Sequence, residues 1–474
     1  MIPALVATLA AVLLFSAGTT AADQRPNILY CVADDWAWPH ASAYGDRVVK
    51  TPAFDRVARE GVLFTHAFSA APSCTPSRAA MLTGQMPHRL AEGGNLHGFL
   101  PSGFQVYPDL LEGAGYQVGF TRKGWGPGNF QAGGRTRNPA GPNFASFAEF
   151  VKAVPQGKPF CFWFGSQDPH RPYEKGSGLK SGLKLEDVRV PPFWPDTPEV
   201  RSDILDYYYE VQRFDREVGE LLELLEASGK LANTLVIITA DNGWPFPRSK
   251  ANLYDAGTRQ PLAVRWPARF KGGKTIDDFI SLTDLAPTLL EAVGLKPVRE
   301  MTGRSFLGLL TGAEKPGKRD KVFVERERHA NVRRGDLSYP ARAIRTKDFL
   351  YIRNFRPERW PAGDPEMYFA VGPFGDCDGS PTKELILAGR NEPQLEKFFR
   401  LCFRKRPAEE LYDLGKDPHQ IDNLAGRPGF AKTQRALRSA LERWMKETGD
   451  PRATSDDDRW DRYPYFGAPA RPTQ

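Results

Sequence analysis

Cysteine is scarce in this chain, with five in 474 residues. This excludes a small secreted scaffold held together by disulfides, which needs a much denser set. Cys31 and Cys161 lie inside apolar, strand-like runs, where we expect buried, inert thiols. Cys377 and Cys402 lie in a later, loop-rich region and could pair, which the sequence leaves open. Cys74 is left over, in polar surroundings.

Long hydrophobic runs are missing after residue 22, and the chain has no internal repeats or low-complexity tracts. We therefore expect no stable membrane association of the mature protein. Residues 1–22 carry no charge, contain an apolar run at 4–15 and end in the small-residue pattern Thr20-Ala21-Ala22. We predict a signal peptide over 1–22 and export, either periplasmic or secreted. Because no Lys or Arg precedes the apolar run, an uncleaved lipid-facing anchor stays open.

The chain also lacks a strong charge of one sign. Lys and Arg number 64 against 57 Asp and Glu, for a formal net charge of +7. This mild basic excess permits an anionic substrate without requiring nucleic acid, and we expect no nucleic-acid partner. Hydrophobic residues at 41% and charged residues at 26% are typical of a globular protein and exclude a disordered or collagen-like chain.

Four short apolar runs each end in polar residues. They cover residues 27–33, 117–121, 159–165 and 234–240. Continuous apolarity indicates strands that are buried on both faces, and helical patterns at 107–115 and 207–227 lie among them. We predict an α/β catalytic domain over 23–320 with a doubly wound, mostly parallel sheet. Ligands of such sheets gather outside the carboxyl ends of the strands, where these polar residues fall.

A second, smaller domain is predicted over 321–449. Runs at 322–324, 341–345 and 349–353 are typical of strands, and the last two are close enough for a hairpin. Residues 430–448 have the pattern of a long helix. We therefore expect a C-terminal antiparallel sheet with a packed helix. The Pro- and Asp-rich segment 450–474 is interpreted as a tail.

Cys74 begins the segment Cys74-Thr75-Pro76-Ser77-Arg78. Proline suits the first turn of a helix, and Arg78 follows one turn after the cysteine. A helix N-terminus favours anions and lowers the pKa of a thiol, so we expect a reactive cysteine at this position. The pattern is short, and by itself it leaves a structural cysteine as the alternative.

This segment, continued by Ala79-Ala80-Met81-Leu82-Thr83-Gly84, resembles the signature of the type I sulfatases, whose cysteine is oxidised to formylglycine. The resemblance covers nearly the whole mature chain and includes Asp34-Asp35 and Asp241-Asn242-Gly243. Asp168-Pro169-His170-Arg171 is similar, more narrowly, to the sulfamidases, or heparan N-sulfatases. The resemblance implies an alkaline-phosphatase-like fold and hydrolysis of sulfate esters or sulfamates of a sulfated carbohydrate.

The resemblance also implies a modified residue and a metal. A formylglycine-generating maturation enzyme would convert Cys74, and the hydrated aldehyde would offer one hydroxyl to attack sulfur and a second to expel sulfate later. Hard oxygen ligands suit calcium or magnesium better than zinc, and one Ca²⁺ is implied. Its ligands would be Asp34, Asp35, Cys74, Asp241 and Asn242. Taken singly, each acidic pair could instead cap a helix or form a turn.

The remaining site residues follow from the same resemblance. Three cations would act on the sulfate, namely Arg78, Lys123 and Lys250. His170 would be the general acid, since an ordinary imidazole pKa of about 6.5 suits proton delivery. Asp168 and His329 are predicted sugar contacts.

Residue 125 departs from the family pattern. Where many sulfatases read Gly-Lys-x-His, this chain has Lys123-Gly124-Trp125, and an indole N–H can donate but cannot act as a base. Two other functions therefore stay open. A phosphoesterase of the same fold would need zinc and a richer set of histidines. A pseudoenzyme that binds sulfated glycans would fit Trp125 and the basic residues at 400–406.

Overall fold

The computed structural model describes residues 25–366 and 372–467. The predicted signal peptide, residues 1–22, lies outside the described residues. Among the helices in the described ranges, none is long and apolar enough to cross a membrane.

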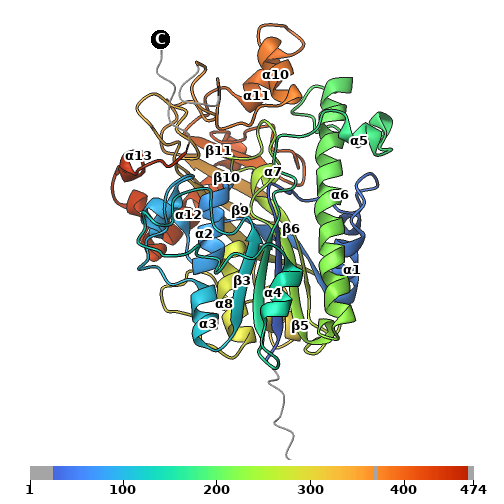
Figure 1. Cartoon of the computed structure of the whole chain (residues 1–474). Coiled ribbons are helices and arrows are strands. Elements are labelled where there is room, and N and C mark those ends of the chain that lie inside the picture. The colour runs from blue at the N-terminus through green and yellow to red at the C-terminus, as the bar shows by residue number, and fades with distance from the viewer. Residues whose placement is uncertain (1–24, 367–371, 468–474) are drawn as a thin grey trace, which may run out of the picture.

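A seven-stranded sheet forms the centre of the larger unit (Figure 1). The four predicted strands are confirmed as a parallel set in the spatial order β3 (Gln117–Arg122), β4 (Phe160–Gly165), β1 (Asn27–Ala33) and β5 (Thr234–Ala240). Three strands not predicted from the sequence extend the sheet beyond β5, namely β6 (Arg259–Arg265), β2 (Val62–Phe68) and β7 (Lys274–Ser281). β6 is antiparallel to both its neighbours, whereas β7 is parallel to β2. Lys274, Thr275 and Asp277 of β7 are exposed at the sheet edge, so this strand lacks a continuous apolar run.

Helices cover both faces of the sheet, as the continuous apolar runs predict. Alternate residues of β1 point to opposite sides, and each side belongs to its own apolar core. One face packs against α1 (Pro52–Glu60) and α6 (Pro198–Ala227). The other packs against α2 (Cys74–Thr83), α3 (Tyr107–Gly113) and α8 (Leu285–Ala292). The result is a three-layer α/β/α arrangement (Figure 1).

α6 is longer than predicted and begins at Pro198 rather than at residue 207. Thr197 caps it, because its side chain accepts a hydrogen bond from the amide of Val200, and proline suits the first helical position. Gly229 follows the helix with a φ of 67°, a conformation that favours glycine. The other helices are α4 (Phe147–Ala153), α5 (Ser177–Lys180), α7 (Asp255–Thr258), α9 (Leu307–Thr311), α10 (Pro381–Ala388), α11 (Glu396–Cys402) and α13 (Arg459–Arg462).

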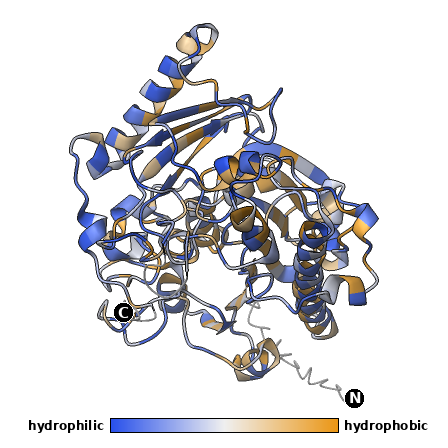
Figure 2. Ribbon diagram, turned by 90° about the horizontal axis from the view of Figure 1, so that it is seen from above, coloured by the Kyte–Doolittle hydropathy of each residue, from blue (hydrophilic) through white to orange (hydrophobic). Residues whose placement is uncertain are grey.

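The smaller C-terminal sheet is antiparallel, as predicted. β8 (Lys321–Arg326), β9 (Ala341–Thr346) and β10 (Phe349–Asn354) match the expected strands, and β11 (Glu409–Asp413) adds a fourth beside β10. α12 (Ala431–Thr448) is the expected helix and packs Leu441 and Met445 against this sheet. Figure 2 shows hydrophobic residues concentrated where the elements pack and hydrophilic ones on the outer turns of the helices.

The segment that follows Gly449 is packed against the molecule, whereas we expected a tail. Trp460 is fully buried, and the carboxylate of Asp450 pairs with Arg342 of β9 at 2.7 Å. Arg328 donates to the backbone oxygens of Tyr463 and Pro464. The described part of this segment, up to residue 467, thus belongs to the folded unit.

The pairing of Cys377 with Cys402, left open by the sequence, does not form. All five cysteines, which lie within the described ranges, carry free and buried thiols. Burial raises the pKa of Cys31 and Cys161, in keeping with the inert thiols expected there.

Candidate active site

The carboxyl ends of β1 and β5 bring together four of the predicted metal ligands. The two strands pair in register, with Ala33 opposite Ala240, so the residues that follow them leave the sheet side by side. The amide of Asp35 donates to Asp241 Oδ1 at 3.1 Å across this junction. The four side chains are at most 2% exposed, and they belong to Asp34, Asp35, Asp241 and Asn242.

α2 places its first residue, Cys74, against these carboxylates. Its Sγ lies 3.4 Å from Asp34 Oδ1 and 4.0 Å from Asp35 Oδ1. The expectation of a lowered thiol pKa is wrong for the unmodified side chain. Burial and the charge of Asp34 raise the pKa of Cys74 well above its ordinary value, although the charge of Lys123 acts in the opposite direction. A thiol kept protonated is a poor nucleophile.

The same cluster fits a hard divalent cation. Ligand atoms of Asp34, Asp35, Cys74 and Asp241 all lie within 4.8 Å of one another. Asn242 Nδ2 donates to Asp35 Oδ1 at 2.5 Å, while Asn242 Oδ1 is buried with no hydrogen-bond partner among the described residues. Buried oxygens without a partner are rare, and a cation would satisfy this one. The predominance of oxygen donors suits calcium or magnesium.

Each of the three predicted cations pairs with a different acid of the cluster. The pairs are Lys123 with Asp34 at 2.5 Å, Arg78 with Asp241 at 2.7 Å and Lys250 with Asp35 at 2.7 Å. Burial opposes the charge of both lysines, but the neighbouring carboxylates outweigh it and raise the pKa of each above its ordinary value. Arg78 and Lys250 are buried, whereas Lys123 keeps 17% of its side chain exposed. All three therefore carry charge within the site.

His170 lies at the solvent side of the cluster, on the loop after β4. Its Nε2 is 3.7 Å from Asp35 Oδ2, and its Nδ1 is 2.5 Å from the backbone oxygen of Arg171. One third of the side chain, 33%, is exposed. The position lets the imidazole contact both the acidic cluster and a bound ligand.

The two predicted sugar contacts have partners within the protein. The carboxylate of Asp168 lies 3.2 Å from Arg213 Nε of α6, and its backbone oxygen accepts from the amide of Asp34. His329 is 5% exposed, and its Nδ1 lies 2.8 Å from the hydroxyl of Ser73, the residue before Cys74. Burial lowers the pKa of His329 to about 3, so this imidazole is neutral at neutral pH.

Asp378 is a site residue that the sequence did not predict. It lies on the loop before α10, and its Oδ2 is 3.2 Å from Lys250 Nζ. Ligand atoms of Asp35, His170 and Asp378 lie within 4.8 Å of one another. The segment Asp376-Cys377-Asp378-Gly379 has two acids and a glycine, but nothing in its spacing ties it to residues so much earlier in the chain.

Trp125, two residues after Lys123, is buried and offers no proton acceptor, because an indole N–H can only donate. It is 4% exposed, and its Nε1 has no hydrogen-bond partner among the described residues. Its backbone amide and oxygen are held by the side chain of Asn138. The nearby backbone oxygen of Lys123 accepts from Trp163 Nε1 instead.

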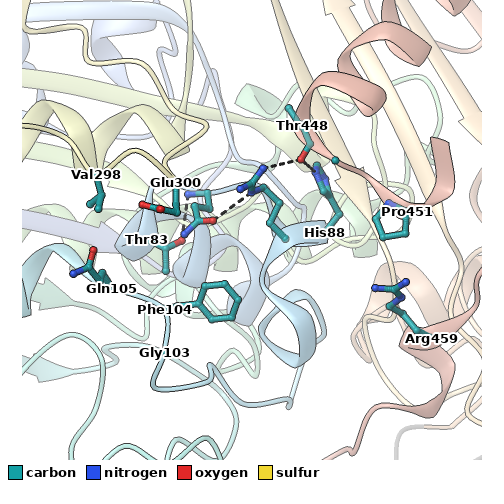
Figure 3. Close-up of a pocket in the computed structure, with 13 residues that line it drawn as sticks. Thr83, His88, Gly103, Phe104, Gln105, Val298, Glu300, Thr448, Pro451 and Arg459 are labelled. Atoms are coloured by element: carbon teal, nitrogen blue, oxygen red, sulfur yellow. Dashed lines mark hydrogen bonds between the residues drawn. The ribbon is translucent and has the colours of Figure 1, made fainter. Parts of the chain in front are cut away.

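A pocket of about 760 Å³ lies at the opposite end of α2 (Figure 3). Thr83, the last residue of this ten-residue helix, lines it together with His88, Thr448 and Arg459. An α-helix rises about 1.5 Å per residue, so Thr83 at the pocket lies about 13 Å along the helix axis from Cys74. The pocket is therefore distinct from the acidic cluster.

Comparison with known families agrees with this geometry. The sulfatase family model matches residues 26–295, which is more than half of the chain, and a model described as N-sulphoglucosamine sulphohydrolase, C-terminal, matches residues 243–365. The chain belongs to the sulfatase family. It is a sulfuric ester hydrolase, and the predicted alkaline-phosphatase-like α/β fold is confirmed.

Individual relatives of this sulfatase match over most of their length. An ulvan-active sulfatase of Formosa agariphila is 29% identical over 90% of this chain and 76% of its own. N-sulphoglucosamine sulphohydrolase of Homo sapiens is 32% identical over 91% of this chain and 92% of its own. A solved structure described as a complex with its substrate, D-glucosamine-2-N,6-O-disulfate, has a TM-score of 0.64 at 20% identity and covers 91% of this chain and 100% of its own. The last likeness is one of fold.

Proposed function

We propose that this sulfatase removes sulfate from a sulfated carbohydrate, as an ester or a sulfamate, with formylglycine at residue 74 and one Ca²⁺. The observation that carries the proposal is the position of Cys74, whose Sγ lies 3.4 Å from Asp34 among three buried or half-buried cations. The relatives' names, an ulvan-active sulfatase and an N-sulphoglucosamine sulphohydrolase, support a carbohydrate substrate.

Residue 74 and the four strand-end residues would hold the calcium ion. The ion supplies positive charge that polarises a sulfuryl oxygen and acidifies a hydroxyl group. The buried, unpartnered Asn242 Oδ1 and the carboxylates of Asp34, Asp35 and Asp241 support this assignment. A plain thiol or serine hydroxyl would lack the second hydroxyl of a hydrated aldehyde, which expels sulfate and regenerates the carbonyl.

The three cations have separate parts in the proposal. Lys123 retains exposed surface and contacts the entering sulfate, and its charge is held by Asp34. Arg78 has no exposed surface and also donates to the backbone oxygens of Lys123 and Gly124, so it steadies residue 74 and the Lys123 loop. Lys250 lies with His170 on the leaving-group side and neutralises charge that develops there.

His170 is the proposed general acid. Its Nδ1, 2.5 Å from the Arg171 oxygen, carries a hydrogen, and this leaves Nε2 to carry the transferable proton. When that proton is delivered to the departing oxygen or nitrogen, the leaving group departs as a neutral alcohol or amine rather than as an alkoxide or amide anion. Such catalysis contributes about 10² to 10⁴-fold.

The contacts of Asp168 and His329 with the sugar stay predictions. Their present hydrogen bonds, to Asp34 and Ser73, support the cluster. A maturation enzyme that oxidises Cys74 and an export route through residues 1–22 complete the proposal. A glycan-binding pseudoenzyme is the outcome that would contradict this proposal, because Trp125 stands where a proton acceptor is expected.

Turnover of matched sulfate and phosphate aryl esters, together with a panel of sulfated glucosamines, tests the proposal. We expect release of inorganic sulfate from the sulfate ester and from at least one sugar. Faster release of phosphate that depends on zinc would establish the phosphoesterase. Glycan binding without any turnover, in protein shown to contain formylglycine and calcium, would establish the pseudoenzyme.

A further inference from the structure

Asp378 reaches the leaving-group side of the site from the loop before α10. Its Oδ2 lies 3.2 Å from Lys250 Nζ, and one of its oxygens lies within 4.8 Å of ligand atoms of both His170 and Asp35. Its side chain is 29% exposed, close to the 33% of His170, whereas Asp35 is fully buried. Asp378 and His170 are therefore the two groups of this trio that meet solvent and an entering ligand.

The loop that carries Asp378 is fixed on its N-terminal side by buried charge. Asp376 is 2% exposed, and its Oδ2 lies 2.5 Å from both Arg326 and Arg333. Its Oδ1 accepts from the amide of Ala330 at 3.0 Å. Removal of one partner of such a buried ion pair is strongly destabilising, so this anchor holds the loop in place.

The C-terminal side of the loop is anchored as firmly. The buried ammonium of Lys383 donates to the backbone oxygens of Cys377 and Phe374 at 2.7 and 3.1 Å. Thr382 donates to Asp203 of α6 at 2.6 Å, which ties the loop to the larger unit. Asp378 thus projects into the site from a preorganised support, the arrangement that makes a single side chain selective.

The chemistry of Asp378 is that of an anionic hydrogen-bond acceptor. Burial acts to raise the pKa of this carboxyl, but the charge of Lys250, with a smaller contribution from His170, outweighs burial, and the pKa of Asp378 lies well below the ordinary value. A carboxylate offers about four acceptor positions on two oxygens, and Lys250 takes one of them. The ammonium of Lys250 also lies between Asp35 and Asp378, where a second metal ion would have to bind.

We infer that Asp378 accepts a hydrogen bond from a hydroxyl or amine on the sugar carbon next to the scissile sulfate, and so selects sugars without a second sulfate there. The inference rests on the proposed function. A donor in this position gains a charge-assisted hydrogen bond, whereas a second sulfate meets a fixed like charge. Selection therefore comes from attraction to the free group and from repulsion of the sulfated one.

The test compares two sugars on one enzyme. The first is a monosulfated glucosamine that the wild type hydrolyses, and the second is the same sugar with an added sulfate on the neighbouring carbon. We expect the wild type to prefer the monosulfate in kcat/KM. Asp378→Asn keeps the shape of the side chain and removes its charge, and it should lower this preference at least tenfold. Asp378→Ser should do the same.

The control is Asp422→Asn, because Asp422 is 59% exposed and pairs with Arg427 on the surface of the smaller unit. It should leave the preference as in the wild type. An equal loss on both sugars in Asp378→Asn would overturn the inference, because it would mean that Asp378 acts only through Lys250. An unchanged preference, or a wild-type preference for the disulfate, would overturn it as well.

Aryl sulfate turnover separates this inference from the proposed function. If the wild type hydrolyses an aryl sulfate and Asp378→Asn leaves the sugar preference unchanged, only the role of Asp378 fails. If the wild type, with formylglycine and calcium shown to be present, hydrolyses neither aryl nor sugar sulfates, the proposed function fails and the selectivity of Asp378 fails with it.

Discussion

At residue 125 an indole occupies the place where many sulfatases have an imidazole. Trp125 Nε1 can only donate, and it is buried without a partner among the described residues. His97 is another candidate proton acceptor, and its pKa is lowered to about 4 by burial and by the charges of Lys123 and Lys250. It is therefore neutral at neutral pH.

The residue at position 125 should govern the second half of the reaction. In the proposed mechanism, attack on sulfur uses residue 74 and His170, whereas release of sulfate needs a proton acceptor. Because a lost general base costs about 10² to 10⁴-fold, we expect a burst of phenol from an aryl sulfate followed by slower steady turnover. Trp125→His should speed the steady phase at least tenfold, as stopped-flow absorbance would show. A linear time course in the wild type would mean that another group already accepts the proton.

The sequence could not predict which acidic residue of the site pairs with which cation. Sequence motifs named Arg78, Lys123 and Lys250, but which acid each would meet depends on how β1, β5 and α2 pack. Asp378 was missed for the same reason, since it enters the site on a loop much later in the chain that is anchored by Asp376. Asp168 and His329 were predicted as sugar contacts, and that stays a prediction; in the structure their side chains lie against Arg213 and Ser73.

At the scale of elements, the carboxyl ends of β1 and β5 carry the residues of the proposed metal centre. We expect that chelation abolishes activity and that calcium or magnesium restores it. Asp241→Ala should lower both metal content, measured by mass spectrometry of the metal, and turnover by at least a hundredfold, because Arg78 also loses its buried partner. Asp422→Asn is the matched control. Restoration by zinc alone would contradict the assignment and favour the phosphoesterase.

The composition of the C-terminal segment led to a wrong prediction of its structure. Its Pro- and Asp-rich sequence suggested a tail, but Arg452 and Arg356 neutralise its aspartates, and Trp460 fills a buried position. The backbone oxygen of Trp460 accepts from Asn95, two residues before His97. A local sequence pattern reports only polarity. The burial of Trp460 depends on tertiary contacts with residues far away in the chain, which a local pattern does not report.

Removal of that tryptophan should test the packing of the segment. Trp460→Ala removes a fully buried ring, a change that costs about 3 to 5 kcal/mol. We expect a clear fall in the thermal midpoint and in turnover, with Trp460→Phe retaining most of both. An unchanged midpoint in Trp460→Ala would show that the segment is a tail after all.

At the scale of the whole molecule, the sequence predicted the layered α/β architecture and its buried parallel strands. It did not predict several strands toward the edges of the two sheets. Buried parallel strands such as β1 and β5 carry continuous apolar runs, which made them visible. β7 carries exposed polar residues, β11 contains three acidic residues among its five, and β6 contains a proline and two arginines, so no apolar run marks these strands. Tertiary pairing, which a local pattern cannot report, supplies these strands.

Buried histidines should make the whole fold sensitive to acid. Burial lowers the pKa of His40 to about 4, below the value of about 6.5 expected in the unfolded chain. The contribution of neutral His40 to the free energy of unfolding is therefore fully present above pH 6.5. It is lost as pH falls toward 4, and the loss is about 2 kcal/mol at pH 5. The thermal midpoint should fall between pH 7 and pH 5, and the fall should be smaller in His40→Gln. An equal fall in both proteins would assign the acid sensitivity to other groups.

The most direct test of the proposed mechanism is peptide mass spectrometry of residue 74 in active protein, with the aldehyde content compared with the rate of sulfate release. We predict an aldehyde at this position and a rate that rises in proportion to its occupancy. Cys74→Ala should be folded and inactive. Full sulfate release by protein that carries only the unmodified Cys74 thiol would contradict the formylglycine mechanism.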